Sequence, residues 1–310
     1  MVRAVSSSPP RRTRPPLRRA EPARGEYRGG MTYEERPAPP ELAGIVTRLW
    51  FLETPPLRRY EKILPLPFVH LIINLSEAYR IHDRHGAASV VPEAFVSGLQ
   101  SEFLVIESPP LIRHVGIELT PMGLHALAPG AAPTAAQAVR DAGALLPGIP
   151  GLVLSLRSVT LPDAALAAAD RWLRERPLHP LDDVAGAALA AIERDPETTI
   201  GALAAELGVS HQRLVARCRA AAGTTPKQYA QVLRFHRLLD AVHAEGGPPE
   251  WAALAAASGY YDQPHVVRAF RRFSGWTPTE YYRLVSEHGP DAAHFIPLEK
   301  VPASEGQARA

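Results

Sequence analysis

Hydrophobic and polar residues alternate in short runs along the first part of the chain, from about residue 41 to residue 120. These runs are rich in β-branched and aromatic residues, and turn residues such as Asp83 to Gly86 separate them. They lie at 44–53, 69–75, 78–83, 94–99 and 112–120. Several short strands at this spacing are typical of a small barrel or sandwich. We therefore predict a β-rich domain over residues 31–160.

The pattern changes to a helical spacing after residue 160. Two runs, at 161–176 and 181–194, place apolar residues three or four positions apart, and a proline-bounded turn separates them. Two helices with so short a connection are expected to pack as an antiparallel pair. We assign residues 161–195 to this helical pair, which we expect to serve as a linker and as a surface for dimerisation.

A repeated pattern of two helices follows in the last third of the chain. The two copies span 199–226 and 251–278. Gly208 and Gly259 end the first helix of each copy, and Ser210 and Asp262 are placed to cap the second helix. Two helices joined by a tight turn that contains glycine form a helix-turn-helix, whose second helix enters the major groove of DNA.

The second helix of each copy carries polar side chains that its own packing does not require. In the first copy these candidates are His211, Gln212, Arg213 and Arg217, and in the second copy they are Gln263, His265, Arg268, Arg271 and Arg272. Arginine and glutamine are suited to reading guanine and adenine edges, and further arginines hold phosphates. We predict base contacts from both helices and phosphate contacts from Arg271 and Arg272. The alternative is that these side chains form only a solvated helix face.

One long amphipathic helix is predicted between the two copies, over residues 225–245. At 1.5 Å per residue it would span roughly 30 Å, and major grooves on one side of DNA recur about every 34 Å. A spacer of this length can present both recognition helices to successive grooves. The sequence therefore predicts an α+β protein whose C-terminal domain, 196–286, is all-helical with two helix-turn-helix units joined by a long helix.

At this point the sequence resembles a known family. Residues 198–284 are similar to the DNA-binding domain of the AraC/XylS family of bacterial transcription regulators, and the ending GYYDQPHVVRAFRRFSGWTPTEYYR at 259–283 closely matches the family signature. The first copy departs from the family at Cys218, where phenylalanine is usual, and at Ala216, which replaces a longer side chain.

The N-terminal half also resembles a domain of this family. Residues 48–127 are similar to the uncharacterised N-terminal domain of one AraC-family subgroup, which implies a small β-barrel that binds an effector or mediates dimerisation. The family resemblance implies double-stranded DNA and RNA polymerase as partners, a small-molecule effector, a homodimer and a cytoplasmic location. Trp50, Phe68, His70 and Asn74 are our candidate effector-binding residues. The alternative for Trp50 is a place in the core.

Charge separates the chain into segments. Residues 1–30 carry eight arginines against two glutamates, residues 31–197 are acidic, and residues 198–286 carry ten Lys and Arg against six Asp and Glu. The first segment is expected to be a disordered basic tail, or else translation begins at Met31. Residues 287–310 lack periodicity, and we expect a flexible tail there.

Composition argues against several other functions. No apolar run approaches the roughly 20 residues that a membrane span requires. Cys218 is the single cysteine, and a G-x-S-x-G motif, a P-loop and an H-E-x-x-H motif are all missing from the sequence. We therefore expect neither an enzyme nor a bound cofactor or metal. A non-specific nucleoid-type DNA binder and a co-regulator that docks on a protein partner remain as alternatives.

Overall fold

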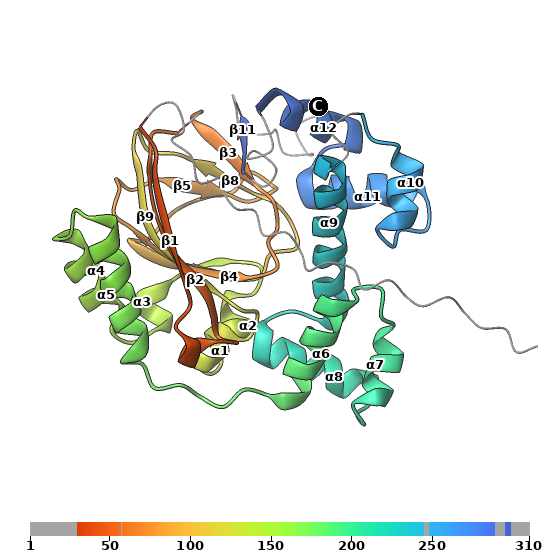
Figure 1. Ribbon diagram of the computed structural model, residues 1–310, viewed down its shortest axis with the longest axis horizontal. Helices are drawn as coiled ribbons and strands as arrows, with labels where there is room; N and C mark the ends of the chain where they lie inside the picture. Colours follow the sequence, from red (N-terminus) through yellow and green to blue (C-terminus); the bar gives the residue numbers. More distant parts are fainter. Residues whose placement is uncertain (1–29, 57, 245–247, 289–294, 299–310) are drawn as a thin grey trace, which may run out of the picture.

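The N-terminal half of the chain is built on two antiparallel sheets (Figure 1). The computed structural model describes residues 30–56, 58–244, 248–288 and 295–298. The first sheet has the order β1 (Thr32–Pro37), β2 (Val46–Thr54), β9 (Ile112–Leu119), β4 (Val69–Asn74), β7 (Ala94–Ser97), β10 (Val139–Asp141). The second has the order β11 (Phe295–Leu298), β3 (Tyr60–Ile63), β8 (Leu104–Glu107), β5 (Arg80–His82), β6 (Ala88–Val90). The predicted α+β class is confirmed, but the described strands form two open sheets and no closed barrel.

The two faces of the first sheet have different surroundings. Strand residues alternate between faces, so Leu71 and Ile73 of β4 point to one side and His70 and Ile72 to the other. Leu71 and Ile73 are fully buried in the main core cluster together with residues of the helices that follow β9. These helices are α1 (Gly123–Leu127), α2 (Ala131–Ala135), α3 (Ala142–Leu145), α4 (Ile149–Arg157) and α5 (Pro162–Arg174). The β-rich domain therefore carries a helical layer that the strand pattern alone did not predict.

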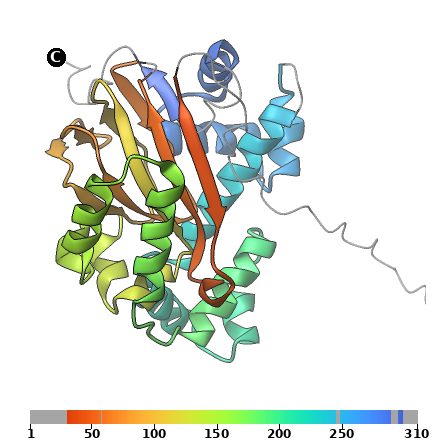
Figure 2. The same ribbon diagram turned by 60° about the vertical axis from the view of Figure 1, so that its left-hand side comes forward.

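The predicted antiparallel pair of helices over 161–195 is wrong as a pair, although both helices form. α5 packs on the first sheet, against β1, β2 and β9, and on α4. α6 (Asp183–Arg194) packs instead against α8 and α9 of the C-terminal half. Figure 2, which brings the α4–α5 side forward, shows α5 lying along the sheet. The apolar face of α5 is buried on the first sheet, and the apolar face of α6 is buried on α8 and α9. The two helices therefore do not pack on each other.

Helices make up most of the C-terminal half. They are α7 (Ile200–Glu206), α8 (His211–Ala222), α9 (Pro226–Ala244), α10 (Trp251–Ala257), α11 (Gln263–Ser274) and α12 (Pro278–His288). Figure 1 shows α9 upright beside the sheets, with α10 and α11 near its upper part and α7 and α8 at its lower end. The cores of the two halves are continuous, because Leu64 and Phe103 of the β domain belong to the same buried cluster as Phe235 and Phe270.

The end of the chain returns to the N-terminal half. β11 pairs with β3 in antiparallel register, with Ile296 opposite Lys62, and Ile296 is fully buried. Pro297 is tolerated because β11 is an edge strand, where one side of the backbone needs no partner. The prediction of a flexible tail from residue 287 is therefore wrong for residues 295–298, where an apolar segment covers the free edge of a sheet.

Two further expectations concern the ends of the chain and membranes. The predicted basic tail at 1–30 lies outside the described residues, apart from Gly30. Within the described residues, none of the helices has the length and hydropathy needed to cross a bilayer.

Candidate nucleic-acid interface

The first helix-turn-helix consists of α7 and α8. Gly208 in the turn has a φ of +66°, a conformation that suits glycine. Ser210 caps α8, because its Oγ accepts a hydrogen bond from the backbone N–H of Arg213 at 3.2 Å. Leu214 and Cys218 are fully buried, and burial raises the pKa of the Cys218 thiol to about 12. Cys218 is thus a packing residue without thiolate chemistry.

The second helix-turn-helix consists of α10 and α11 and repeats the same devices. Gly259 in the turn has a φ of +76°. The Oδ1 atom of Asp262 accepts a hydrogen bond from the backbone N–H of His265 at 2.7 Å and so caps α11. Gly275 ends α11 in the left-handed conformation, with a φ of +76°. Equivalent caps on two helices of 12 residues each give the two units matching recognition helices.

α9 links the two units as a continuous helix of 19 residues. It is about 28 Å long at 1.5 Å per residue, close to the spacing of successive major grooves. One side of α9 is buried in the shared core through Val232, Phe235, Leu239 and Val242. A buried, uninterrupted helix fixes the spacing of the two recognition helices.

On α8, three of the predicted contact residues are free to meet a ligand and one is not. His211, Gln212 and Arg213 are exposed. The guanidinium of Arg217 is instead held by Asp182, the capping residue of α6, with Nε at 2.9 and 2.8 Å from the two carboxylate oxygens. This places Arg217 in a bridge between α8 and α6, and sequence reasoning missed Asp182 because it lies 35 residues away.

On α11, the five predicted residues divide between two directions. Gln263, Arg268 and Arg271 are exposed, and the Arg268 side chain is 70% exposed. His265 and Arg272 are partly buried. The ring of His265 stands edge-on to Tyr260 at 5.1 Å between centroids, and Arg272 Nη1 donates to Gln231 Oε1 of α9 at 3.0 Å. Arg272 is therefore turned toward α9 and not directly outward.

Trp50 lies on β2, His70 and Asn74 lie on β4 and Phe68 directly precedes β4, and three of these four candidate effector residues come together. The ring of His70 is 6.2 Å from that of Trp50 and 5.2 Å from that of Phe68, both edge-on. Asn74 lies at the other end of β4, where its Oδ1 accepts from the N–H of Ser76 at 2.9 Å and its amide donates to the carbonyl of Glu77. Asn74 stabilises a turn, so the structure does not bring it to the other three.

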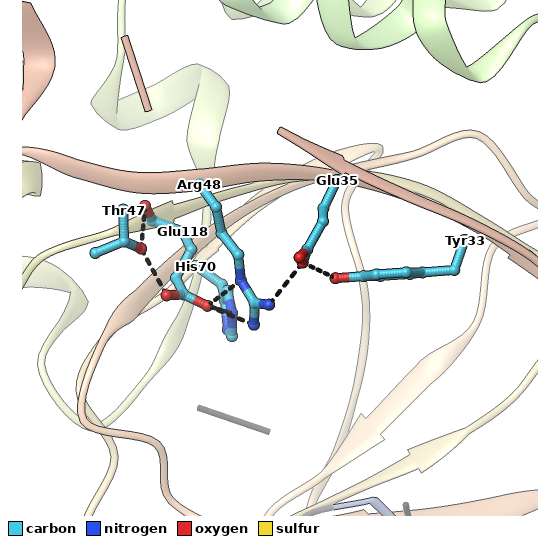
Figure 3. Close-up of polar contacts among 6 residues, drawn as sticks. All are labelled: Tyr33, Glu35, Thr47, Arg48, His70 and Glu118. Atoms are coloured by element: carbon cyan, nitrogen blue, oxygen red, sulfur yellow. Dashed lines mark hydrogen bonds and ion pairs between the residues drawn. The ribbon is translucent and has the colours of Figure 1, made fainter. Parts of the chain in front are cut away.

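A buried polar network adjoins His70 (Figure 3). Arg48 pairs with Glu118 at 2.9 Å and with Glu35 at 2.9 Å, and the Glu118 side chain is completely buried. Thr47 Oγ1 donates to Glu118 Oε1 at 2.5 Å. One cation thus faces two carboxylates in the interior of the domain. Sequence reasoning missed this network, although a charged residue such as Glu118 within a buried strand is a signal for one.

The charge state of His70 follows from these surroundings. Its Nε2 lies 3.9 Å from Glu118 Oε2. Burial lowers the pKa of His70 to about 4, against the opposing effect of Glu118. The imidazole is therefore neutral at physiological pH and can both donate and accept a hydrogen bond.

Both halves of the chain match known protein families. Residues 203–283 match a helix-turn-helix domain family, and residues 34–139 match a domain family of unknown function, DUF6597. A protein of Streptomyces antibioticus with the provisional name AraC-like transcription regulator is 33% identical over 102 residues. That match covers 32% of this chain and 33% of the relative, so it spans about a third of the relative's length.

Solved structures of ToxT from Vibrio cholerae have a similar arrangement of elements. A 1.65 Å structure gives a TM-score of 0.43 at 10% identity, covering 82% of this chain and 97% of that chain. A structure of wild-type ToxT with a bound unsaturated fatty acid gives a TM-score of 0.42 at 9% identity, covering 75% and 93%.

Proposed function

We propose that this chain, which belongs to the AraC family of bacterial transcription regulators, binds duplex DNA at specific sequences through two successive major grooves. The observation that carries the proposal is the pair of equivalent recognition helices, α8 and α11, held at a fixed spacing by α9. Each has an outward face of polar and basic side chains, which include Gln212 and Arg213 on α8 and Gln263 and Arg268 on α11. These side chains are suited to base edges and phosphates.

Selection of binding sites from a random duplex library with the purified full chain tests this function. We expect an enriched motif with two contacted blocks about one helical turn apart. Binding without enrichment would favour the alternative of a non-specific nucleoid-type protein. No binding of duplex DNA at any salt concentration would favour a co-regulator whose basic helices dock on a protein.

We also propose that the N-terminal domain binds a small-molecule effector at Trp50, Phe68 and His70. In support, three rings with partial exposure stand beside a buried polar network, an arrangement of apolar walls and few polar groups that small-molecule sites favour. The segment that leads to Phe68 touches α9, because the carbonyl of Pro65 lies 2.6 Å from His236 Nε2. A ligand at Phe68 would therefore act close to the helix that spaces the two units.

Binding of an effector can be tested without knowing its identity. A library of small metabolites is screened by thermal shift with the wild-type chain, and hits are repeated with His70→Ala and Trp50→Ala. A hit that raises the melting temperature of the wild-type chain and of neither variant would support the site. Hits that act equally on all three proteins would count against it.

Partners and location are proposed on the family resemblance alone. As a bacterial transcription regulator the chain would act in the cytoplasm, contact RNA polymerase and form a homodimer. The predicted dimer surface at 161–195 is divided between α5 and α6, which lie in different halves of the molecule, so a dimer would use one of the two. Sedimentation velocity of the full chain, with and without duplex DNA, measures the oligomeric state.

A further inference from the structure

A hollow of about 200 Å³ opens between α9 and the second recognition helix, α11. Gln231 and Arg234 line it from α9 and Tyr260 from the turn before α11, together with His265, Arg268, Ala269, Arg272 and Phe273 of α11. None of these eight residues is acidic, and three of them are arginines. The composition of the walls is suited to an anion.

The cationic groups in the walls have N–H donors to spare. Arg272 Nη1 donates to Gln231 Oε1 at 3.0 Å, which uses one of its five N–H groups. Arg234 Nη1 approaches the carbonyl of Gly259 at 3.5 Å, and its Nε is buried without a hydrogen-bond partner. Arg234 lines the hollow and its hydrogen bond to Gly259 is a long one, so its guanidinium retains N–H groups that can donate to an anion.

The same arginines also act on His265. Burial lowers the pKa of His265, and Arg268 and Arg234 lower it further, against a smaller opposing effect of Asp262. Two acidic side chains lie beside this site: Asp262, whose Oδ1 is 4.0 Å from Arg268 Nη2, and Glu197, whose carboxylate packs against Gly259. The three arginines of the wall outnumber these two neighbouring carboxylates, and none of the wall residues is itself acidic.

We propose that this hollow is a phosphate-binding site in which Arg234, Arg272 and His265 hold one backbone phosphodiester of the bound duplex. The proposal rests on the function proposed above and deepens it. Arg268, which stands at the rim with most of its side chain exposed, remains free for base edges. Arg234 joins the binding surface from α9, so a phosphate held there would fix the distance of α11 from the DNA backbone.

The test uses the duplex obtained from the selection described above. Each backbone phosphate is replaced in turn by a neutral methylphosphonate, and the affinity of the wild-type chain and of Arg234→Gln is measured by fluorescence anisotropy. We expect one position at which the wild-type chain loses about tenfold or more in affinity and Arg234→Gln loses nothing further. Arg234→Gln should also reduce the salt slope by about one and leave the base preferences unchanged.

A matched control separates this site from the loss of any positive charge. Arg283→Gln removes an arginine from α12 whose side chain is 70% exposed, and it should keep the methylphosphonate profile of the wild-type chain. Equal sensitivity of wild-type and Arg234→Gln chains at every phosphate would overturn the proposal.

Inorganic phosphate and pyrophosphate test the hollow without DNA. The imidazole signals of His265, identified by their loss in His265→Gln, are followed by NMR against pH in the presence of each anion. A bound anion should raise the pKa of His265, and Arg234→Gln should abolish the rise. No rise would overturn the site. A rise with no methylphosphonate effect would overturn DNA as the source of the phosphate, and failure of the wild-type chain to bind any duplex would overturn the function itself.

Discussion

Lys62 of β3 donates a hydrogen bond from Nζ to the carbonyl oxygen of Ser274, the last residue of α11, at 2.6 Å. Its ammonium group also lies over the rings of Phe103, at 3.9 Å, and Trp276, at 3.5 Å. Lys62 is almost completely buried. The second recognition helix is thus anchored at its C-terminal end by a side chain of the N-terminal domain, which links the position of α11 to the second sheet.

Replacing Lys62 by methionine should change how stability depends on pH. Burial lowers the pKa of Lys62 to about 7, below the value of about 10.4 in an unfolded chain. Between these values the unfolded state binds a proton that the folded state lacks, so the free energy of unfolding rises with pH by about 1.4 kcal/mol per unit. Urea unfolding at pH 6.5, 8 and 9.5 should show the wild-type chain gaining on Lys62→Met. If the wild-type chain gains no stability relative to Lys62→Met as the pH rises, the ring faces hold the charged form of Lys62.

Gly275→Ala should destabilise the chain more than Gly208→Ala. Both glycines have positive φ, which costs a residue with a Cβ roughly 1–2 kcal/mol. At Gly208 a Cβ would meet nothing within 4 Å, whereas at Gly275 it would lie 2.8 Å from Phe103 Cε1. The contact with Phe103 adds to the backbone term, and thermal unfolding of the two variants measures the difference. Equal losses would mean that Phe103 moves aside freely.

Glu118→Gln should destabilise the N-terminal domain by about 3 kcal/mol, because it leaves the partly buried Arg48 with Glu35 as its one carboxylate partner. The double variant Arg48→Met with Glu118→Leu removes both charges, and we expect it to be more stable than Glu118→Gln alone. Urea unfolding of the three proteins gives the order. A double variant that is less stable than Glu118→Gln would show that the ion pair itself stabilises the domain.

Arg217→Ala and Arg213→Ala should have different effects although both residues lie on α8. Arg217 is held by Asp182, so its loss should lower the free energy of unfolding by about 1 kcal/mol and leave base preferences unchanged. Arg213 is exposed, and its loss should weaken binding at the selected site by roughly 1–3 kcal/mol. Unfolding curves and anisotropy titrations of both variants separate the two roles.

Arg268→Ala should weaken binding to the selected duplex by roughly 1–3 kcal/mol and relax discrimination at one base pair. The expectation follows from the 70% exposure of this side chain on α11. Competition titrations against duplexes with single base-pair changes measure it. Unchanged affinity and unchanged discrimination would remove Arg268 from the base-reading set.

Local signals in the sequence were sufficient for the C-terminal half. Gly208 and Gly259 mark the turns, and Ser210 and Asp262 mark the starts of the recognition helices, because caps and left-handed glycines act over a few residues. The long helix predicted over 225–245 forms as Pro226–Ala244, and α8 and α11 begin directly after their predicted caps. The division of α11 into outward residues and residues turned toward α9 required the tertiary structure, since Gln231 and Arg272 are 41 residues apart.

In the N-terminal half, some strands and helix partners could not be predicted because they depend on segments that are distant in the sequence. β1 and β11 are short polar or proline-containing edge strands, which carry no clear alternation of their own and form because an open sheet edge accepts them. The partners of α5 and α6 were mispredicted for a related reason. An amphipathic face specifies that a helix is buried, but it does not specify against which surface.

The pairing of β11 with β3 makes the DNA-binding half an insertion in a topological sense. It follows β10 of the first sheet and α5, which packs on that sheet, and it precedes β11 of the second sheet. Because the two halves also share a buried core, this unit cannot swing away on a single linker. A signal from the N-terminal domain would therefore reach the recognition helices through direct packing and through the contact of Lys62 with the end of α11.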